Sequence, residues 1–371
     1  MAGTYLEKLA RLLVQYSVAV QADQKILISG STSSVPLVQA IYVEVLKAGA
    51  HPQVDLAFPG QEYLFYCHAA DHQIDQVDTA RLHTYETVDA MIAVFPDLNP
   101  RSLSSIDAGL KQRRTRANEK LSQTVFRRWG NGELKWVGTG YPSAALAQEA
   151  GMALPEYEAF VYGAMRLDLD DPVAHWSAFS VEQEKICQRL NRVKTVRIVG
   201  QDTDLVYSCA GRQWINCDGK NNFPDGEVFT GPIEDSVEGR IRFSYPGIFQ
   251  GQEVEDIQLT FEKGKVVKAS AAKGEALLHA LLDTDDGARY VGEAAIGTNY
   301  GITRFTKNML FDEKMGGTVH LAVGRGIPES GSKNQSAIHW DMLKDMKQGG
   351  ELWADGVLIY RNGTFLDEFL L

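Results

Sequence analysis

The sequence lacks long apolar runs, closely spaced cysteine pairs and an excess of basic residues. No run in its 371 residues approaches the roughly 20 apolar residues of a membrane span. Its four cysteines show no Cys-x-x-Cys spacing, which argues against a cysteine zinc site and favours a reduced chain. The formal net charge of −11 argues against a general nucleic-acid binder, because a polyanion would be repelled.

The first residues also lack the uninterrupted apolar core of a signal peptide. Residues 4–16 carry charges within an apolar pattern, which predicts an amphipathic helix. Together with the missing membrane span, this pattern leads us to expect a cytoplasmic protein.

What is present indicates a globular chain of about two domains. The composition is 44% hydrophobic and 23% charged, which is enough apolar material for sizeable cores. Short apolar strands in the first half are separated by helical segments, and this order predicts a mostly parallel, doubly wound sheet. The expected strands cover residues 25–30, 53–58, 89–95 and 134–138.

From residue 195 onward the pattern changes to short strands in which apolar and polar residues alternate. Residues 257–261 and 265–268 form a hairpin around Gly264. We therefore expect an α/β domain over residues 1–193 and a strand-rich, mixed α+β domain over residues 194–371.

Two motifs in the first half carry little weight. The basic stretch over residues 111–116 lies in a helix, and in an acidic chain it indicates a solvated helix face more than a nucleic-acid site. The segment Gly138-Thr-Gly140 lacks the third glycine of a dinucleotide-binding loop and the lysine of a P-loop.

Two histidines in the second half lie in patterns typical of strands. In such a strand His339 and Asp341 point to the same side, while Trp340 points to the core. His320 alternates with apolar residues and shares its face with Thr318, Ala322 and Gly324, whose small side chains leave room for an ion. A hydrogen-bonded structural histidine is the alternative for either residue taken alone.

Three glutamates complete the candidate site. Pro224 and Gly226 shape a tight loop that delivers Glu227 to the start of a strand. Glu293 is a lone acid in a largely apolar strand, so it needs a cation or another partner if it is buried. The pattern around Glu313 is equally compatible with a surface residue. This mixture of imidazoles and carboxylates is what a pair of divalent ions needs, and it predicts a metallohydrolase.

Ordered motifs in the C-terminal half resemble the M29 family of thermophilic metalloproteases, which are metallo-aminopeptidases. The motifs are Asn-x-Pro-Asp-Gly-Glu-Val-Phe at residues 222–229, Gly-Glu at 292–293, Leu-Phe-Asp-Glu at 310–313 and Ser-x-x-His-x-Asp at 336–341. The resemblance implies a homodimer that binds two divalent ions per chain, with zinc, cobalt, magnesium or manganese as candidates. The implied ligands are Glu227, Glu293, Glu313, His320, His339 and Asp341, with Glu293 as the bridge.

The resemblance further implies a peptide substrate with a free N-terminus, no membrane partner and no nucleic acid. Two ions would lower the pKa of a shared water, and Glu227 or Glu293 would move the proton to the leaving amine. One departure is Ile327, which stands where many members have a tyrosine. Arg325 or Ser332 then becomes the candidate donor to the oxyanion.

Two rival hypotheses remain. A mononuclear iron dioxygenase that opens hydroxypyridine rings, a relative of this family, would need only His320, His339 and Asp341 as ligands. That hypothesis leaves the three glutamates without a purpose. The other rival is a protein that binds metal for structural reasons and has no turnover.

Overall fold

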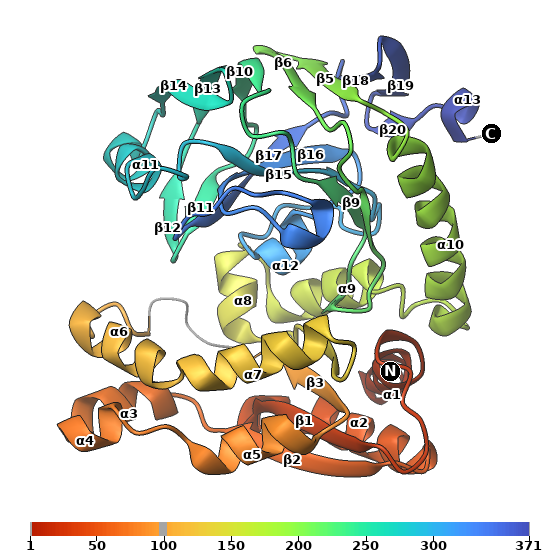
Figure 1. Cartoon of the computed structure of the whole chain (residues 1–371). Coiled ribbons are helices and arrows are strands. Elements are labelled where there is room, and N and C mark those ends of the chain that lie inside the picture. Colours follow the sequence, from red (N-terminus) through yellow and green to blue (C-terminus); the bar gives the residue numbers. More distant parts are fainter. Residues whose placement is uncertain (1, 96–101, 371) are drawn as a thin grey trace. The chain divides into compact units, whose positions relative to one another are not determined.

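The computed structural model describes residues 2–95 and 102–370, and in it the chain divides into two compact units (Figure 1). Unit 1 consists of Met1–Trp176 and Gly219–Phe223, and unit 2 consists of Ser177–Asp218 and Pro224–Leu371. The domain boundary expected near residue 193 stays a prediction.

Unit 1 contains a five-stranded parallel sheet in the order β2-β1-β3-β4-β8, as the alternation of strands and helices predicts. The strands are β1 Lys25–Ser31, β2 His51–Ala57, β3 Ala90–Val94, β4 Lys135–Thr139 and β8 Asn222–Phe223. β1 lies between β2 and β3, and its apolar residues 26–28 are buried, which is typical of parallel strands covered on both faces. The last strand, β8, comes from far along the chain and was not expected.

The helices of unit 1 connect these strands and flank them in sequence. Ser34 precedes α2, and Pro36 lies in its first turn, as expected for a proline at a helix start. The helical segments are α1 Ala2–Arg11, η1 Leu12–Ser17, η2 Thr32–Ser34, α2 Val35–Lys47, α3 Gln61–His68, α4 Asp71–Ile74, α5 Thr79–Thr87, α6 Ala108–Ala117, α7 Glu119–Gly130, α8 Ala144–Glu149 and α9 Leu154–Ala164.

Unit 2 is built from two antiparallel sheets and a small hairpin, β11-β12. The larger sheet has the order β14-β13-β10-β6-β5-β18-β19-β20, and the smaller has the order β17-β16-β15-β9-β7. The strands are β5 Thr195–Gly200, β6 Thr203–Ser208, β7 Ile215–Cys217, β9 Glu227–Thr230, β10 Glu238–Arg242, β11 Gly247–Phe249, β12 Gln252–Val254, β13 Gln258–Glu262, β14 Lys265–Ser270, β15 Val291–Gly297, β16 Thr318–Gly324, β17 His339–Asp345, β18 Glu351–Ala354, β19 Val357–Arg361 and β20 Thr364–Phe365. The helices are α11 Glu275–Leu282, α12 Met309–Asp312, η3 Pro328–Ser330 and α13 Asp367–Leu370, and α10 Pro172–Leu190 begins in unit 1 and continues in unit 2. The predicted fold class is confirmed.

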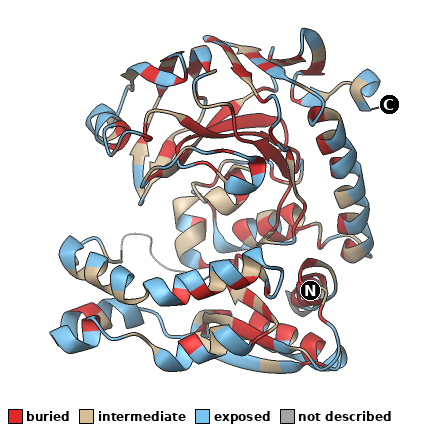
Figure 2. Cartoon of the chain, viewed as in Figure 1, coloured by how far each residue is buried: buried red, intermediate tan, exposed pale blue. Residues whose placement is uncertain are grey.

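One face of the smaller sheet forms the core of unit 2. Leu321 and Val323 of β16 and Trp340 of β17 belong to one buried apolar cluster with Ile198 and Leu259 of the larger sheet. Each fully buried large side chain stabilises the fold by about 1.5–3 kcal/mol. All seven residues of both β15 and β16 are buried (Figure 2), so the opposite face of this sheet is also shielded from water.

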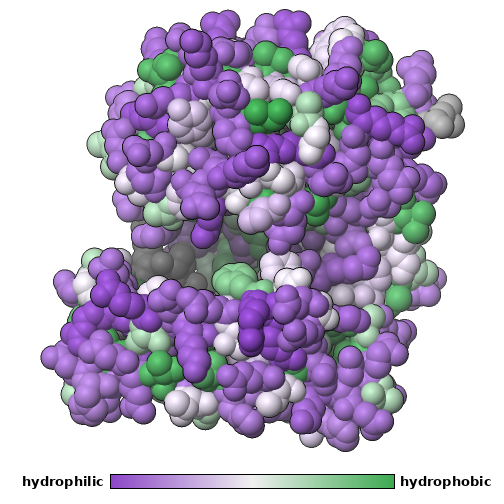
Figure 3. All heavy atoms as spheres, viewed as in Figure 1, coloured by the Kyte–Doolittle hydropathy of each residue, from purple (hydrophilic) through white to green (hydrophobic). Residues whose placement is uncertain are grey.

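On the face drawn in Figure 3 most surface residues are hydrophilic, and the apolar residues lie in small groups. The basic helix α6 has no buried residue, and Arg113 forms ion pairs with Asp71 and Asp75. These contacts match the solvated face expected for that stretch. Within residues 2–95 and 102–370, no helix combines the length and apolar character needed to cross a membrane.

Candidate metal centre

The register of the smaller sheet places predicted residues from three strands on one face. Glu293 of β15 pairs with Ala322 of β16, and Ala322 pairs with Asp341 of β17, so the three residues form one row across the sheet. His320 precedes Ala322 by two residues, and His339 precedes Asp341 by two. All four ionisable side chains therefore share the face opposite the apolar core.

Small residues surround these side chains in the sheet. Ala295 lies opposite His320, Gly324 lies opposite His339, and Gly297 lies opposite Glu227 of β9. Residues without long side chains leave space above this face of the sheet. The sequence predicts such space beside His320, because the residues that share its face are small.

The loop before β9 delivers Glu227 to this face. Gly226 has a φ of +122°, and an added Cβ there would lie 2.7 Å from the Cβ of Asn299, so glycine is required. Its carbonyl accepts a hydrogen bond from the backbone N–H of Thr298, and its own N–H donates to the Cys217 carbonyl. β9 begins at Glu227, as predicted.

Glu313 reaches the same region from the end of the short helix α12. Asn308 caps this helix by accepting a hydrogen bond from the backbone N–H of Leu310. Asp312 is fully buried and accepts hydrogen bonds from the backbone N–H and the hydroxyl of Thr306. Burial also raises the pKa of Asp312 to about 7. These contacts fix the turn that presents Glu313.

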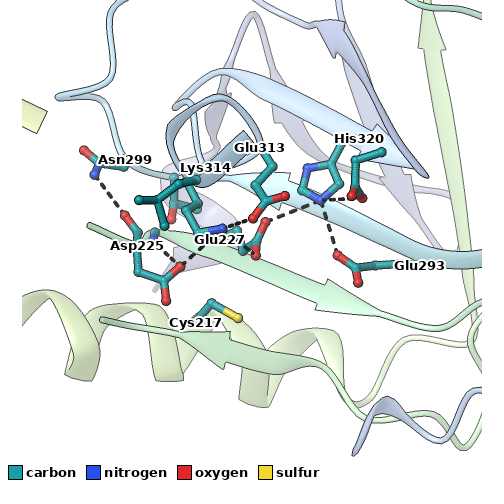
Figure 4. A network of polar contacts seen from close by, with 12 residues as sticks. Cys217, Asp225, Glu227, Glu293, Asn299, Glu313, Lys314 and His320 are labelled. Atoms are coloured by element: carbon teal, nitrogen blue, oxygen red, sulfur yellow. Dashed lines mark hydrogen bonds and ion pairs between the residues drawn. The ribbon is translucent and has the colours of Figure 1, made fainter. Parts of the chain in front are cut away.

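The side chains of Glu227, Glu293 and His320 meet in a buried cluster (Figure 4). His320 Nε2 lies 3.4 Å from Glu227 Oε2, 3.3 Å from Glu293 Oε1 and 3.9 Å from Asp341 Oδ1. His339 Nε2 lies 3.8 Å from Glu293 Oε2 and 3.5 Å from Asp341 Oδ2. Glu293 therefore presents one oxygen to each histidine.

A backbone contact fixes the orientation of His339. Its Nδ1–H donates a 2.7 Å hydrogen bond to the carbonyl of Arg325, while the Arg325 side chain is exposed. This bond leaves Nε2 facing the carboxylates, and a histidine that binds a metal through one ring nitrogen usually donates from the other nitrogen in this way.

Sequence reasoning missed three residues of the cluster: Lys314, Asp225 and Cys217. The Lys314 side chain is fully buried, and its Nζ lies 3.4 Å from Glu227 Oε1 and 4.0 Å from Asp225 Oδ1. It also donates to Glu313 Oε1. Ligand atoms of Cys217, Asp225 and Glu227 all lie within 4.8 Å of one another. Asp225 and Lys314 lie in loops, and Cys217 ends the three-residue strand β7, so none of the three lies in a segment long enough to show a periodicity in the sequence.

The metal-free cluster holds protons that an ion would displace. Burial raises the pKa of Glu227 to about 8. Burial works to lower the pKa of His320, but Glu293, Glu227 and Asp341 outweigh it and raise that pKa to about 9. For His339, Asp341 and Glu293 outweigh burial in the same way and raise the pKa to about 10.

Two other groups in the cluster keep their charge. Burial works to raise the pKa of Asp341, but the adjacent His339 outweighs it and lowers that pKa to about 2. Burial likewise opposes the charge of Lys314, but Glu227, Glu313 and Asp225 hold its pKa well above the usual range.

Several buried polar atoms of the cluster fit a bound cation. Glu227 Oε2 and Asp341 Oδ1 are buried without a hydrogen-bond partner among the described residues. Leaving such atoms unpaired is costly, and a positive ion at this place would satisfy both. Carboxylate oxygens together with two imidazole nitrogens form a donor set suited to zinc and similar divalent ions.

The profile of the thermophilic metalloprotease family (M29) matches residues 3–365 of the chain. The chain belongs to this family. The family resemblance stated from sequence motifs is thereby confirmed, and the chain is a metallopeptidase, a hydrolase of peptide bonds.

Individual relatives match over nearly the whole length. The chain is 27% identical to "Aminopeptidase 2" of Geobacillus stearothermophilus, over 98% of each sequence. It is 28% identical to "Aminopeptidase T" of Thermus thermophilus, over 97% of this chain and 95% of the relative.

Two solved structures share the fold. Wild-type AmpT from Thermus thermophilus superposes with a TM-score of 0.84 at 24% identity, over 98% of this chain and 99% of the other. The 2,5-dihydroxypyridine dioxygenase from Pseudomonas putida KT2440 superposes with a TM-score of 0.57 at 12% identity, over 98% and 96%. At these identities both likenesses concern the fold alone.

Proposed function

We propose that this chain is an aminopeptidase that removes the N-terminal residue of peptides by means of a water activated by two divalent ions. Zinc, cobalt, magnesium and manganese are the candidate metals. The proposed ligands are Glu227, Glu293, Glu313, His320, His339 and Asp341.

The observation that carries the proposal is the placement of Glu293. Its Oε1 faces His320 Nε2 at 3.3 Å, and its Oε2 faces His339 Nε2 at 3.8 Å. A carboxylate that offers one oxygen to each of two imidazoles is placed to bridge two ions. One position would then be lined by Glu227, Glu293 and His320, and the other by Glu293, His339 and Asp341.

The charge of the cluster supports two ions over one. The cluster contains one ammonium, that of Lys314, and five carboxylates, those of Asp225, Glu227, Glu293, Glu313 and Asp341. With neutral imidazoles the cluster carries an excess of four negative charges, which two divalent ions balance. One ion would leave two buried negative charges uncompensated, and such charges are costly.

The metal ions and the side chains of the cluster would have different roles in the reaction. Two ions held by the proposed ligands would supply a nucleophile at neutral pH and would polarise the scissile carbonyl. Glu227 is buried beside His320 and Lys314 and is the first candidate to carry a proton to the leaving amine. Glu293 is the second candidate for this role. Ile327 is half-buried at the position of the family tyrosine, and Arg325 and Ser332 remain the candidate donors to the oxyanion.

The relatives support cleavage from the N-terminus. Both are named aminopeptidases and match this chain along nearly their full length. A free α-amine of the substrate would bind the site as an additional ligand, which restricts cleavage to the first peptide bond. We further propose a cytoplasmic homodimer that acts on peptides and binds neither membrane nor nucleic acid.

The mononuclear iron dioxygenase remains the second candidate, since a structure with that activity shares the fold. It would use His320, His339 and Asp341. The positions of Glu227 and Glu293, both within 3.4 Å of His320 Nε2, favour the peptidase because one iron would leave these buried carboxylates without a role.

Blocking the substrate amine tests the proposed specificity. We expect the protein loaded with zinc, cobalt or manganese to release leucine from a leucyl tripeptide. It should leave the N-acetylated tripeptide uncut, because the acetyl group removes the basic amine. Liquid chromatography of both reactions gives the answer. Equal cleavage of the two peptides, or consumption of oxygen with a hydroxypyridine instead, would reject the aminopeptidase.

A further inference from the structure

Lys314 is a fully buried lysine at the edge of the proposed metal centre (Figure 4). Its ammonium contacts three carboxylates, those of Glu313, Glu227 and Asp225. A buried ammonium needs one carboxylate to balance its charge. Three carboxylates around one ammonium therefore exceed what a structural ion pair requires.

The contacts use particular oxygens of the two proposed ligands. Lys314 approaches Oε1 of Glu227, while Oε2 of the same carboxylate faces His320 Nε2 at 3.4 Å. Lys314 also binds Oε1 of Glu313. Each glutamate thus has one oxygen occupied by the ammonium and one oxygen left for another partner.

The third carboxylate, that of Asp225, belongs to a loop that hydrogen bonds hold in place. Asp225 is buried, and its backbone carbonyl accepts a 2.9 Å hydrogen bond from Asn299 Nδ2. The backbone N–H of Asn299 in turn donates to the carbonyl of Lys314 at 3.0 Å. Asn299 therefore links the loop that carries Lys314 to the loop that carries Asp225 and precedes Glu227. These hydrogen bonds hold the ammonium near the Asp225 carboxylate.

We propose that Lys314 is a positioning residue of the metal centre, which orients Glu227 and Glu313 so that each offers a single oxygen to the ion beside His320. This inference rests on the proposed function, and it adds a residue that the proposed ligand set does not contain. Lys314 would act through the two glutamates and not on the substrate, because its side chain is fully buried. Its loss should weaken the ion beside His320 and leave the ion beside His339 bound.

A second buried lysine in unit 2 provides a matched control. Lys344 is also buried, and its Nζ donates to the backbone carbonyls of Gln201 at 3.0 Å and Arg242 at 3.1 Å. It lies on β17 but points away from the face that carries Asp341. Lys344→Met removes a buried ammonium of equal size without touching the proposed ligands.

The test compares wild type, Lys314→Met and Lys344→Met by equilibrium dialysis against cobalt(II), with metal counted by elemental analysis and ligand geometry followed by the visible spectrum. We expect two ions per chain in wild type and in Lys344→Met. In Lys314→Met the ion beside His320 should bind about 10–100-fold more weakly, which is the usual loss when a residue that orients metal ligands is removed. The spectral band of that ion should be missing when cobalt is limiting.

The outcomes separate the two proposals. If wild type binds two ions and Lys314→Met binds both with wild-type affinity, the role of Lys314 is rejected and the two-ion function stands. If wild type binds only one ion, the two-ion function itself fails. If Lys314→Met does not fold, as judged by circular dichroism, Lys314→Gln takes its place, because the amide keeps one donor while it removes the charge.

Discussion

Replacing Glu293 by glutamine lowers kcat/KM for a leucyl amide by about 10³-fold or more, because bridging two ions is worth several kcal/mol of transition-state stabilisation. The side chain keeps its size, so the sheet should still form. Glutamine has one carbonyl oxygen and one NH₂ group, so it cannot offer an oxygen to each of the two positions beside His320 and His339. Steady-state kinetics with excess metal measures the effect.

Glu262→Gln is the matched control for this substitution. Glu262 lies on β13 of the same unit, and its side chain is exposed. We expect wild-type activity from this variant. Wild-type kcat/KM in Glu293→Gln itself, with the variant folded, would show that the cluster has no part in turnover and would favour the structural metal-binding alternative.

Removing the metal abolishes the peptidase activity and lowers the unfolding temperature. Ions that bind only the folded chain stabilise it by about 2.7 kcal/mol per site at a concentration 100-fold above Kd, which corresponds to about 5–10 °C for a unit of this size. The cluster gives the reason, since Glu227 Oε2 and Asp341 Oδ1 have no hydrogen-bond partner among the described residues. Differential scanning calorimetry before and after dialysis against a chelator measures the shift.

Restoring the metal is the control for this experiment. Zinc, cobalt or manganese added back to the dialysed protein should recover both the activity and the unfolding temperature. Full activity in a sample that elemental analysis shows to be free of metal would contradict the account.

Strand periodicity was enough to predict three members of the site. His339 and Asp341 alternate with apolar residues in one strand, and His320 does so in another, so the sequence alone places each of them on the face of its strand opposite the core. The register that aligns Glu293 with Asp341 across Ala322 is a property of the folded sheet. The sequence therefore gives the face of each strand on which a residue lies. It does not show that the histidine nitrogens lie 3–4 Å from the carboxylate oxygens of the neighbouring strands.

Loops account for what the sequence left open. Glu313 follows a helix of only four residues, and its position depends on the contact between Asp312 and Thr306. Lys314 is a charged residue in a loop, which by itself indicates exposure, yet it is fully buried. Its burial depends on carboxylates that lie as far as 89 positions away in the chain, and no local pattern encodes such contacts.

In the parallel sheet, too, the sequence predicts the strands that have a local pattern and misses the one that depends on a distant contact. The four expected strands of the parallel sheet follow from their apolar runs and the helices between them. The fifth, β8, is a two-residue strand that pairs with β4 from more than 80 residues away. Asn222 and Phe223 directly precede the loop that leads to Glu227, and a strand of two residues shows no periodicity in the sequence.

Calorimetric titration of zinc into the metal-free protein, carried out at pH 7 in two buffers of different ionisation enthalpy, tests the two-ion centre most directly. The account predicts two ions per chain. It also predicts release of about three protons, because the pKa values of Glu227, His320 and His339 are raised to about 8, 9 and 10 and these groups hold protons at pH 7 until the ions displace them. Affinity should fall as the pH is lowered, since protons then compete more strongly. One ion per chain, or binding without proton release, would contradict the account.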